Sequence, residues 1–192
     1  TEELIYSNSD YSEYPWVFIS PEAQTLFNKV KISGTELLCN IADIPVGLQT
    51  SADKIYIVNS TKETDNSIFF NQNDVEWEIE KDITLPCLYD VSITLFDTPK
   101  ANSFIIFPYQ ISDDTATIYS EVFMKSNFPK CWEYLNYHKT ALEKRSINGK
   151  EPVWYQYGRS QSLTKFHSAS KIIFSVLSTG QSYAYDKENI QF

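Results

Sequence analysis

The apolar residues of this chain come in short runs, and their spacing changes from one run to the next. In residues 75–80, Val75, Trp77 and Ile79 alternate with glutamates, which is typical of a strand with one wet face. In residues 128–145 the apolar residues instead recur every three or four positions, as in a helix. Short strands interspersed with isolated helices predict an α+β fold, in which a mixed, largely antiparallel sheet packs against two or three helices.

Two segments carry helix-start signals as well as a helical period. In residues 19–30, Ser20 can cap the helix and Pro21 suits its first position. The second predicted helix, residues 127–145, has Pro129 near its start and ends at Lys144-Arg145, a basic pair that complements the helix dipole. The first helix is predicted to carry an apolar stripe of Ala23, Leu26, Phe27 and Val30. The second is predicted to present Cys131, Tyr134, Leu135, His138 and Leu142 on one face and Glu133, Tyr137, Thr140 and Lys144 on the other.

Eight short segments are predicted as strands because they are rich in β-branched and aromatic residues. They are residues 15–19, 55–58, 67–70, 75–79, 102–107, 116–123, 171–177 and 182–185. The run at 102–107 is nearly continuously apolar and ends at Pro108, which predicts a central strand with 116–123 beside it. The run at 171–177 is predicted to be another buried strand.

Charge is distributed unevenly along the sequence. The net charge is −9, yet residues 1–124 contain 6 lysines and 20 acidic residues, whereas residues 125–171 contain 9 basic and 3 acidic residues. Because salt screens exposed charges over roughly 8 Å, a local basic cluster can bind a polyanion despite an acidic remainder. We expect the basic side chains of residues 125–171 to converge into a concave wall that fits a double helix. A solvated basic face without a partner explains the same composition.

The sequence lacks motifs for catalysis and cofactor binding. The GxxxxGK[ST] and GxGxxG patterns do not occur, and the cysteines and histidines lack zinc-ligand spacing. Three cysteines without a CxxC pattern predict reduced, buried thiols in a cytoplasmic protein. We therefore expect no catalytic residue, no cofactor and no metal in this chain.

The sequence also carries no signal for a membrane. No apolar run is long enough to cross a bilayer, and the N-terminus is polar and acidic rather than a signal peptide. The chain begins without an initiator methionine, so we expect it to be a piece of a longer polypeptide. We expect no membrane partner.

Six segments together resemble the TaqI-like C-terminal specificity domain of adenine-N6 DNA methyltransferases from bacterial restriction-modification systems. They are IADIPVGLQTSADKIYIV (41–58), IEKDITLPCLYDVSI (79–93), FIIFPYQ (104–110), FPKCWEYLNYHKTALEKR (128–145), WYQYGRSQSL (154–163) and KIIFSVLSTGQSYAYD (171–186). They occur in the family's order and cover most of the chain from about Leu38 to Asp186. The resemblance implies that residues 1–192 form one target recognition domain, which reads double-stranded DNA.

The resemblance also implies a catalytic partner. An upstream domain of the same polypeptide would bind S-adenosylmethionine and methylate an adenine flipped out of the duplex. The family's Asn-Pro-Pro-Tyr motif is missing here, since IIFPY (105–109) shares only Pro108 and Tyr109 with it. We expect the fragment to methylate nothing by itself, and the parent to be an adenine-specific DNA methyltransferase, with or without endonuclease activity.

The peptide PVWYQYGRSQSL, residues 152–163, combines aromatic residues with groups that can contact DNA. Arginine can fork onto guanine or phosphate, glutamine can pair with adenine, and serines can reach phosphates. Composition alone favours a structural loop, in which Arg159 pairs with a carboxylate and Gln161 caps a turn. The resemblance instead favours DNA contact through Arg159, Ser160, Gln161 and Ser162. The aromatic residues expected to anchor the loop in the core are Trp154, Tyr155 and Tyr157.

A second candidate loop, GLQTSADK (47–54), precedes a predicted strand. An ordinary β-turn explains its composition as well as DNA contact does. Its candidate DNA-binding residues are Gln49, Thr50, Ser51 and Lys54. Lys165 and Lys171 are further candidates for phosphate contacts, although exposed lysines commonly serve solubility alone.

Two functions from other classes compete with DNA recognition. A protein-interaction module would dock on a partner subunit through exposed aromatic residues, without DNA contact, and its binding would be insensitive to salt. A small hydrolase would need a histidine within hydrogen-bond reach of a thiol in a cleft.

Overall fold

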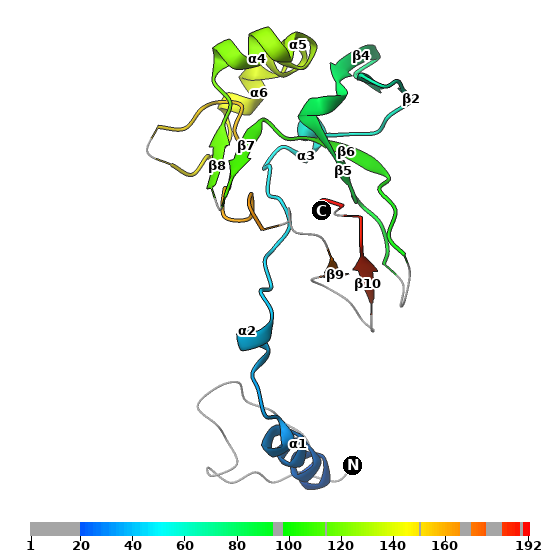
Figure 1. The fold of residues 1–192 in the computed structure, drawn as a ribbon, viewed down its shortest axis with the longest axis vertical. Coiled ribbons are helices and arrows are strands. Elements are labelled where there is room, and N and C mark those ends of the chain that lie inside the picture. The colour runs from blue at the N-terminus through cyan, green and yellow to red at the C-terminus, as the bar shows by residue number, and fades with distance from the viewer. Residues whose placement is uncertain are drawn as a thin grey trace. The chain divides into compact units, whose positions relative to one another are not determined.

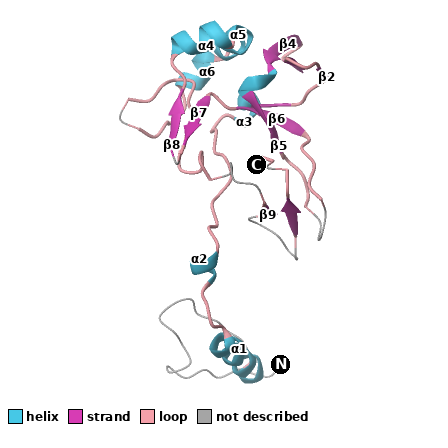
Figure 2. Cartoon of the chain, viewed as in Figure 1, coloured by secondary structure: helices cyan, strands magenta, loops and turns pink. Residues whose placement is uncertain are grey.

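The computed structural model describes residues 20–93, 98–113, 115–149, 151–165, 170–175, 182–188 and 190–192. The chain forms two compact units, Thr1–Ile44 and Pro45–Phe192. Helices and short antiparallel strands make up the second unit, so the predicted α+β class is confirmed (Figure 1, Figure 2). The predicted strand at residues 15–19 lies outside the described residues.

Residues 20–44, the described part of the N-terminal unit, contain the helices α1 (Pro21–Ser33) and α2 (Leu38–Ile41). The Ser20 hydroxyl accepts a hydrogen bond from the Ala23 backbone N–H at 3.3 Å, and Pro21 is the first helical residue, as predicted. No residue of α1 is buried, so its apolar stripe is exposed.

The C-terminal unit contains two three-stranded antiparallel sheets. The first consists, in spatial order, of β1 (Ile57–Val58), β6 (Ser103–Ile106) and β5 (Thr84–Cys87). The second consists of β2 (Lys62–Glu63), β3 (Ser67–Gln72) and β4 (Val75–Glu80). Since β6 lies between two partners, the predicted central strand is confirmed.

Two two-stranded antiparallel sheets complete the strands. They are β7 (Tyr109–Ser112) with β8 (Thr115–Ile118), and β9 (Lys171–Phe174) with β10 (Tyr183–Asp186). The prediction that 116–123 pairs beside the central strand is wrong, because β8 pairs with β7 and Ser120 then caps a helix through the Phe123 N–H. The predicted burial of 171–177 is also wrong for β9, in which only Ile173 is buried.

The helices of this unit are α3 (Asp53–Tyr56), α4 (Glu121–Asn127), α5 (Pro129–Tyr137) and α6 (Lys139–Glu143). Two predictions need correction here. Residues 55–58 are strand only in their second half, since α3 takes up the first. The single predicted helix over 127–145 is interrupted at His138, whose φ of −90° and ψ of 2° leave the helical region. The predicted apolar face is buried at Cys131, Tyr134, Leu135 and Leu142.

The acidic face of β4 is covered rather than wet at its C-terminal end. The two carboxylate oxygens of Glu80 accept hydrogen bonds from the backbone N–H groups of Lys130 and Cys131, each at 2.9 Å. Glu78 pairs with the Lys130 ammonium. Only Glu76 among the three glutamates is exposed, because α5 starts over the other two. The predicted wet face is therefore corrected at Glu80, which is engaged by the start of α5, whereas the Glu78 side chain remains 35% exposed.

Aromatic side chains dominate the main core. Its largest fully buried members are Tyr56, Tyr134, Tyr155, Tyr157 and Phe70. A smaller cluster of Leu88, Ile173 and Ile190 lies apart from it. Two of the three free cysteines, Cys87 and Cys131, are buried as predicted, but Cys39 is exposed. Within the described part of the chain, no helix is both long and apolar enough to span a membrane.

Candidate nucleic-acid interface

The aromatic residues of the 152–163 peptide fix it to the core. The Tyr157 hydroxyl donates to the Ile106 carbonyl at 2.5 Å, and the Tyr157 backbone N–H donates to the Tyr109 hydroxyl at 2.6 Å. The Tyr155 hydroxyl donates to the Tyr119 carbonyl at 2.6 Å. The two tyrosines are fully buried, so the prediction that they anchor this peptide is confirmed.

The two candidate loops lie side by side although a hundred residues separate them in sequence. The Gly158 N–H donates to the Thr50 carbonyl at 3.0 Å, and the Arg159 N–H donates to the Gln49 carbonyl at 3.2 Å. The Gly158 carbonyl in turn accepts the Asn148 N–H at 3.0 Å. We refer to residues 47–54 and 158–162 together as the loop pair.

The loop pair requires a glycine at position 158, where the two loops come into contact. A β-carbon on Gly158 would lie 2.1 Å from the Ser51 hydroxyl oxygen and 2.6 Å from the Ser51 β-carbon. Ser51 itself has a φ of 55°, in the left-handed region that serine seldom adopts. Close approach and an uncommon backbone conformation thus coincide at this contact.

Several predicted contact residues present free polar groups on the loop pair. The exposed ones are Ser51, Lys54, Arg159, Ser160 and Gln161, and Gln49 is partly exposed. Among the described residues, no carboxylate pairs with Arg159 and the Gln161 side chain makes no hydrogen bond. The structural reading of these two residues, an ion pair and a turn cap, therefore does not hold.

Thr50 and Ser162 instead lie inside the fold. Thr50 is fully buried, and its hydroxyl donates to the Asp53 carboxylate at 2.5 Å and accepts the Ala52 N–H at 2.9 Å. Ser162 is also buried. These two side chains stabilise the loops from inside the fold. Their burial does not favour direct contact with DNA.

Lys171 is tied to the hairpin formed by β9 and β10. Its ammonium lies 2.8 Å from the carboxylate of Asp186, which is buried. Burial alone would raise the pKa of Asp186, but Lys171 and the backbone N–H groups of Glu188 and Ile190 together lower it below the usual value. Lys171 is thus a structural partner of a carboxylate. Lys165 is exposed, at the end of the second loop's turn.

Several basic side chains that were expected to line a concave wall are engaged in ion pairs or hydrogen bonds within the fold. Lys125, Lys130 and Lys139 pair with Glu121, Glu78 and Glu143 at 3.2, 2.5 and 3.7 Å. Lys171 pairs with Asp186, and Arg145 is directed at backbone carbonyls. The sequence could not reveal the pairs of Lys130 and Lys171, because their carboxylates come from other elements. Four basic side chains of this range are therefore paired with carboxylates, whereas Arg145 and Arg159 have no carboxylate partner among the described residues.

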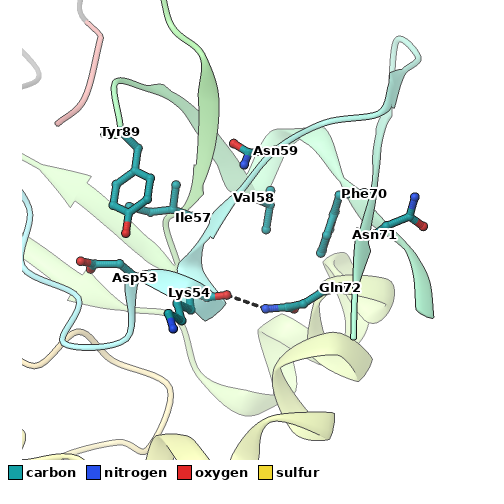
Figure 3. A pocket seen from close by; sticks show the side chains of 9 residues that line it. All are labelled: Asp53, Lys54, Ile57, Val58, Asn59, Phe70, Asn71, Gln72 and Tyr89. Carbon is teal, nitrogen blue, oxygen red and sulfur yellow. Dashed lines mark hydrogen bonds between the residues drawn. The ribbon is translucent and has the colours of Figure 1, made fainter. Parts of the chain in front are cut away.

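A pocket of about 260 Å³ begins where the first loop ends (Figure 3). Its polar lining includes Lys54, Asn59 and Asn71, and its apolar lining includes Phe70 and Tyr89. Figure 3 shows the side-chain amide of Gln72, the last residue of β3, bonded to the carbonyl of Lys54 in α3. The asparagines were not predicted, since neither belongs to a motif.

The described thiols are poor nucleophiles where they are buried. Burial raises the pKa of Cys87 to about 12 and that of Cys131 well above its usual value. His138 contacts the Gln72 side-chain oxygen through Nε2 at 3.1 Å rather than a thiol. These contacts do not favour a thiol hydrolase. His167 lies outside the described residues.

Comparison with known proteins relates this chain to a restriction-modification enzyme. No family model matches the sequence. The chain is 32% identical, over 195 aligned residues, to "Type II restriction enzyme and methyltransferase RM.Eco57I" from Escherichia coli. The alignment covers 94% of this chain but 19% of that protein, so the chain spans about a fifth of its relative's length.

Proposed function

We propose that this chain is the DNA-recognition segment of a restriction-modification enzyme and contacts duplex DNA through the loop pair. In this proposal, residues 1–192 form the target recognition domain, which positions an adenine for an S-adenosylmethionine-dependent methyltransferase domain elsewhere in the polypeptide. The similarity to RM.Eco57I supports the enzyme class. The observation that carries the DNA contact is the joining of two polar loops by backbone hydrogen bonds, with Arg159 exposed and unpaired among the described residues.

The exposed side chains of the loop pair each suit a particular kind of contact, apart from the Asp53 carboxylate, which accepts the Thr50 hydroxyl. Arg159 can form two hydrogen bonds to guanine O6 and N7, and Gln49 and Gln161 can do the same with adenine N6 and N7. The remaining exposed groups, Ser51, Lys54 and Ser160, suit phosphate oxygens. Because backbone bonds join the loops, such contacts would be presented as one preorganised surface rather than as two independent loops.

Replacing Arg159 with alanine tests the proposal. We expect the chain to bind a pool of random-sequence DNA duplexes weakly, with an affinity that falls steeply as salt rises, because condensed cations are released. Arg159→Ala should weaken binding to the preferred duplexes by about 1–3 kcal/mol and relax the preference at one base pair, as read by selection and sequencing.

Lys62→Ala is the matched control, since Lys62 lies in β2 and its loss changes the net charge equally. An Arg159→Ala variant that keeps both the affinity and the selected sequence removes Arg159 from the interface. A wild-type chain with no salt-dependent duplex binding contradicts the proposal as a whole.

A second candidate function is docking on a protein, without DNA contact. One face of the β9–β10 hairpin supports it, because cross-strand register brings Ile172, Phe174, Tyr183 and Tyr185 together and all four are exposed. Binding through this face would be insensitive to salt and would be lost in Phe174→Ser while Arg159→Ala binds normally.

A further inference from the structure

The side chain of Arg145 donates hydrogen bonds to backbone carbonyls within the fold. Its Nε–H donates to the Leu142 carbonyl at 3.0 Å, at the end of α6, in keeping with the predicted role at the helix dipole. The other donors leave the helix. Nη1 donates to the Thr50 carbonyl at 2.6 Å, and Nη2 donates to the carbonyls of Trp154 and Gln156, each at 2.9 Å.

These acceptors belong to three segments that are distant in sequence. They are the end of α6, the first loop, and the stretch that leads into the second loop. The Thr50 carbonyl also accepts the Gly158 N–H, so one oxygen joins Arg145 to both loops. The guanidinium carbon lies 5.3 Å from the ring centroid of Tyr56, which is fully buried.

The geometry suits arginine and not lysine. A planar guanidinium group directs five N–H bonds in fixed directions and can span several carbonyls, whereas an ammonium group offers its donors from one atom. Among the described residues no carboxylate pairs with Arg145, and its hydrogen-bond partners are backbone carbonyls and, 3.4 Å from Nη2, the Tyr56 hydroxyl. The residue keeps its positive charge at the base of the loop pair.

We infer that Arg145 is the positioning residue of the loop pair. It fixes the Thr50 carbonyl to which the second loop is bonded, and it thereby sets where Arg159 and Gln161 lie. Arg145 itself does not need to touch DNA. The effect on DNA affinity rests on the proposed function, whereas the effect on loop order does not.

Amide hydrogen exchange in the 192-residue chain tests the effect on loop order. We expect Arg145→Lys to speed exchange of the Gly158 and Arg159 amides about tenfold or more, while amides of the β3–β4 hairpin keep their protection. Lys144→Ala is the control, because it removes a neighbouring exposed charge and should leave both loop amides protected. Unchanged protection of Gly158 and Arg159 in Arg145→Lys overturns the inference.

Binding to the random-sequence duplex pool tests the effect on affinity. Arg145→Lys keeps the charge, so an affinity loss of about tenfold would report lost geometry rather than lost electrostatics. Altered exchange with wild-type affinity overturns the coupling between Arg145 and binding. Altered exchange in a chain whose wild type binds no duplex supports the positioning role and contradicts the proposed function.

A measurement on the wild-type chain covers the case in which Arg145→Lys does not fold. Nitrogen-15 spectra should show a slowly exchanging Arg145 Nε–H and separate Nη signals, because the hydrogen bonds hinder rotation of the guanidinium group. Rapid exchange with averaged Nη signals overturns the inference without any variant.

Discussion

Ser51 and Gly158 show how single residues set the candidate interface. The second loop can donate its backbone N–H groups to the carbonyls of the first only if the two segments approach closely. A β-carbon on residue 158 would lie so near the Ser51 oxygen, at 2.1 Å, that the contact leaves no room for alanine. The sequence marks Ser51 as a candidate for DNA contact but gives no sign that it packs against Gly158. The role of Ser51 and Gly158 in this contact is steric, because the position of each residue limits the space that is left for the other.

Gly158→Ala should push the loops apart. We expect a loss of about 1–3 kcal/mol in the free energy of unfolding, as for other overpacked sites, together with weaker duplex binding. Ser51→Gly alone should change stability little, because the φ of 55° suits glycine and offsets its greater chain entropy. Urea unfolding of both single variants gives the two values.

The double variant provides the decisive comparison. With Ser51→Gly present, the nearest remaining atom to the new β-carbon is the Ser146 carbonyl oxygen at 3.4 Å, so Gly158→Ala should become nearly harmless. The two changes should therefore be strongly non-additive. Additive losses would mean that Gly158 acts through something other than its contact with Ser51.

At the scale of elements, α5 begins with a cap that its own sequence does not supply. Phe128 precedes the helix and offers no side-chain hydrogen bond. Glu80, at the end of β4, accepts the N–H groups of the second and third helical residues instead, which is the role of an N-cap side chain. A strand and a helix fifty residues apart are joined in this way.

Glu80→Ala should cost about 1–2 kcal/mol of unfolding free energy, because two N–H groups lose a charged acceptor near the positive end of the helix dipole. Glu76→Ala is the control, since Glu76 is on the same face of β4 but is exposed. Its urea midpoint should match that of the wild type. Equal destabilisation by the two changes would assign the effect to strand charge rather than to capping.

Local patterns predicted the elements better than their partners. The Ser20 cap and the central strand β6 follow from nearby residues, and both were predicted. The helix break at His138 was not predicted. Tyr134 and His138 contact the Gln72 side chain of β3, and such a contact between distant segments leaves no pattern in the local sequence. The pairing of β8 with β7 was not predicted either, because the periodicity of a segment indicates a strand but not which strand it pairs with.

At the scale of the whole molecule, the candidate site follows from tertiary contacts. The sequence identified both loops by composition, but only the hydrogen bonds from Gly158 and Arg159 bring them together. The charge count along the sequence predicted that the basic residues of 125–171 are available to bind DNA. In the structure, Lys130 and Lys171 pair with acidic residues of other elements. Charge counts along a chain do not report which charges are paired in space.

Residues 190–192 join the first loop to β5 in the larger unit. The Leu48 N–H donates to the Phe192 carbonyl at 2.6 Å, and a β-carbon at Gly47 would collide with that same carbonyl. Gln191 forms a parallel bridge with Cys87 and exchanges two backbone hydrogen bonds with β5 and the residue after it, each at 2.8 Å. Ile190 is buried.

Two truncated chains test how this unit holds together. Residues 45–192 contain every member of the main core, so we expect this fragment to unfold cooperatively in urea on its own. A fragment of residues 45–189 loses three backbone hydrogen bonds and one buried isoleucine, which together should lower its unfolding free energy by about 3 kcal/mol or more. If 45–189 unfolds at the same urea concentration as 45–192, residues 190–192 do not contribute to the stability of this unit. Loss of cooperativity in 45–192 would instead show that residues 1–44 complete the core.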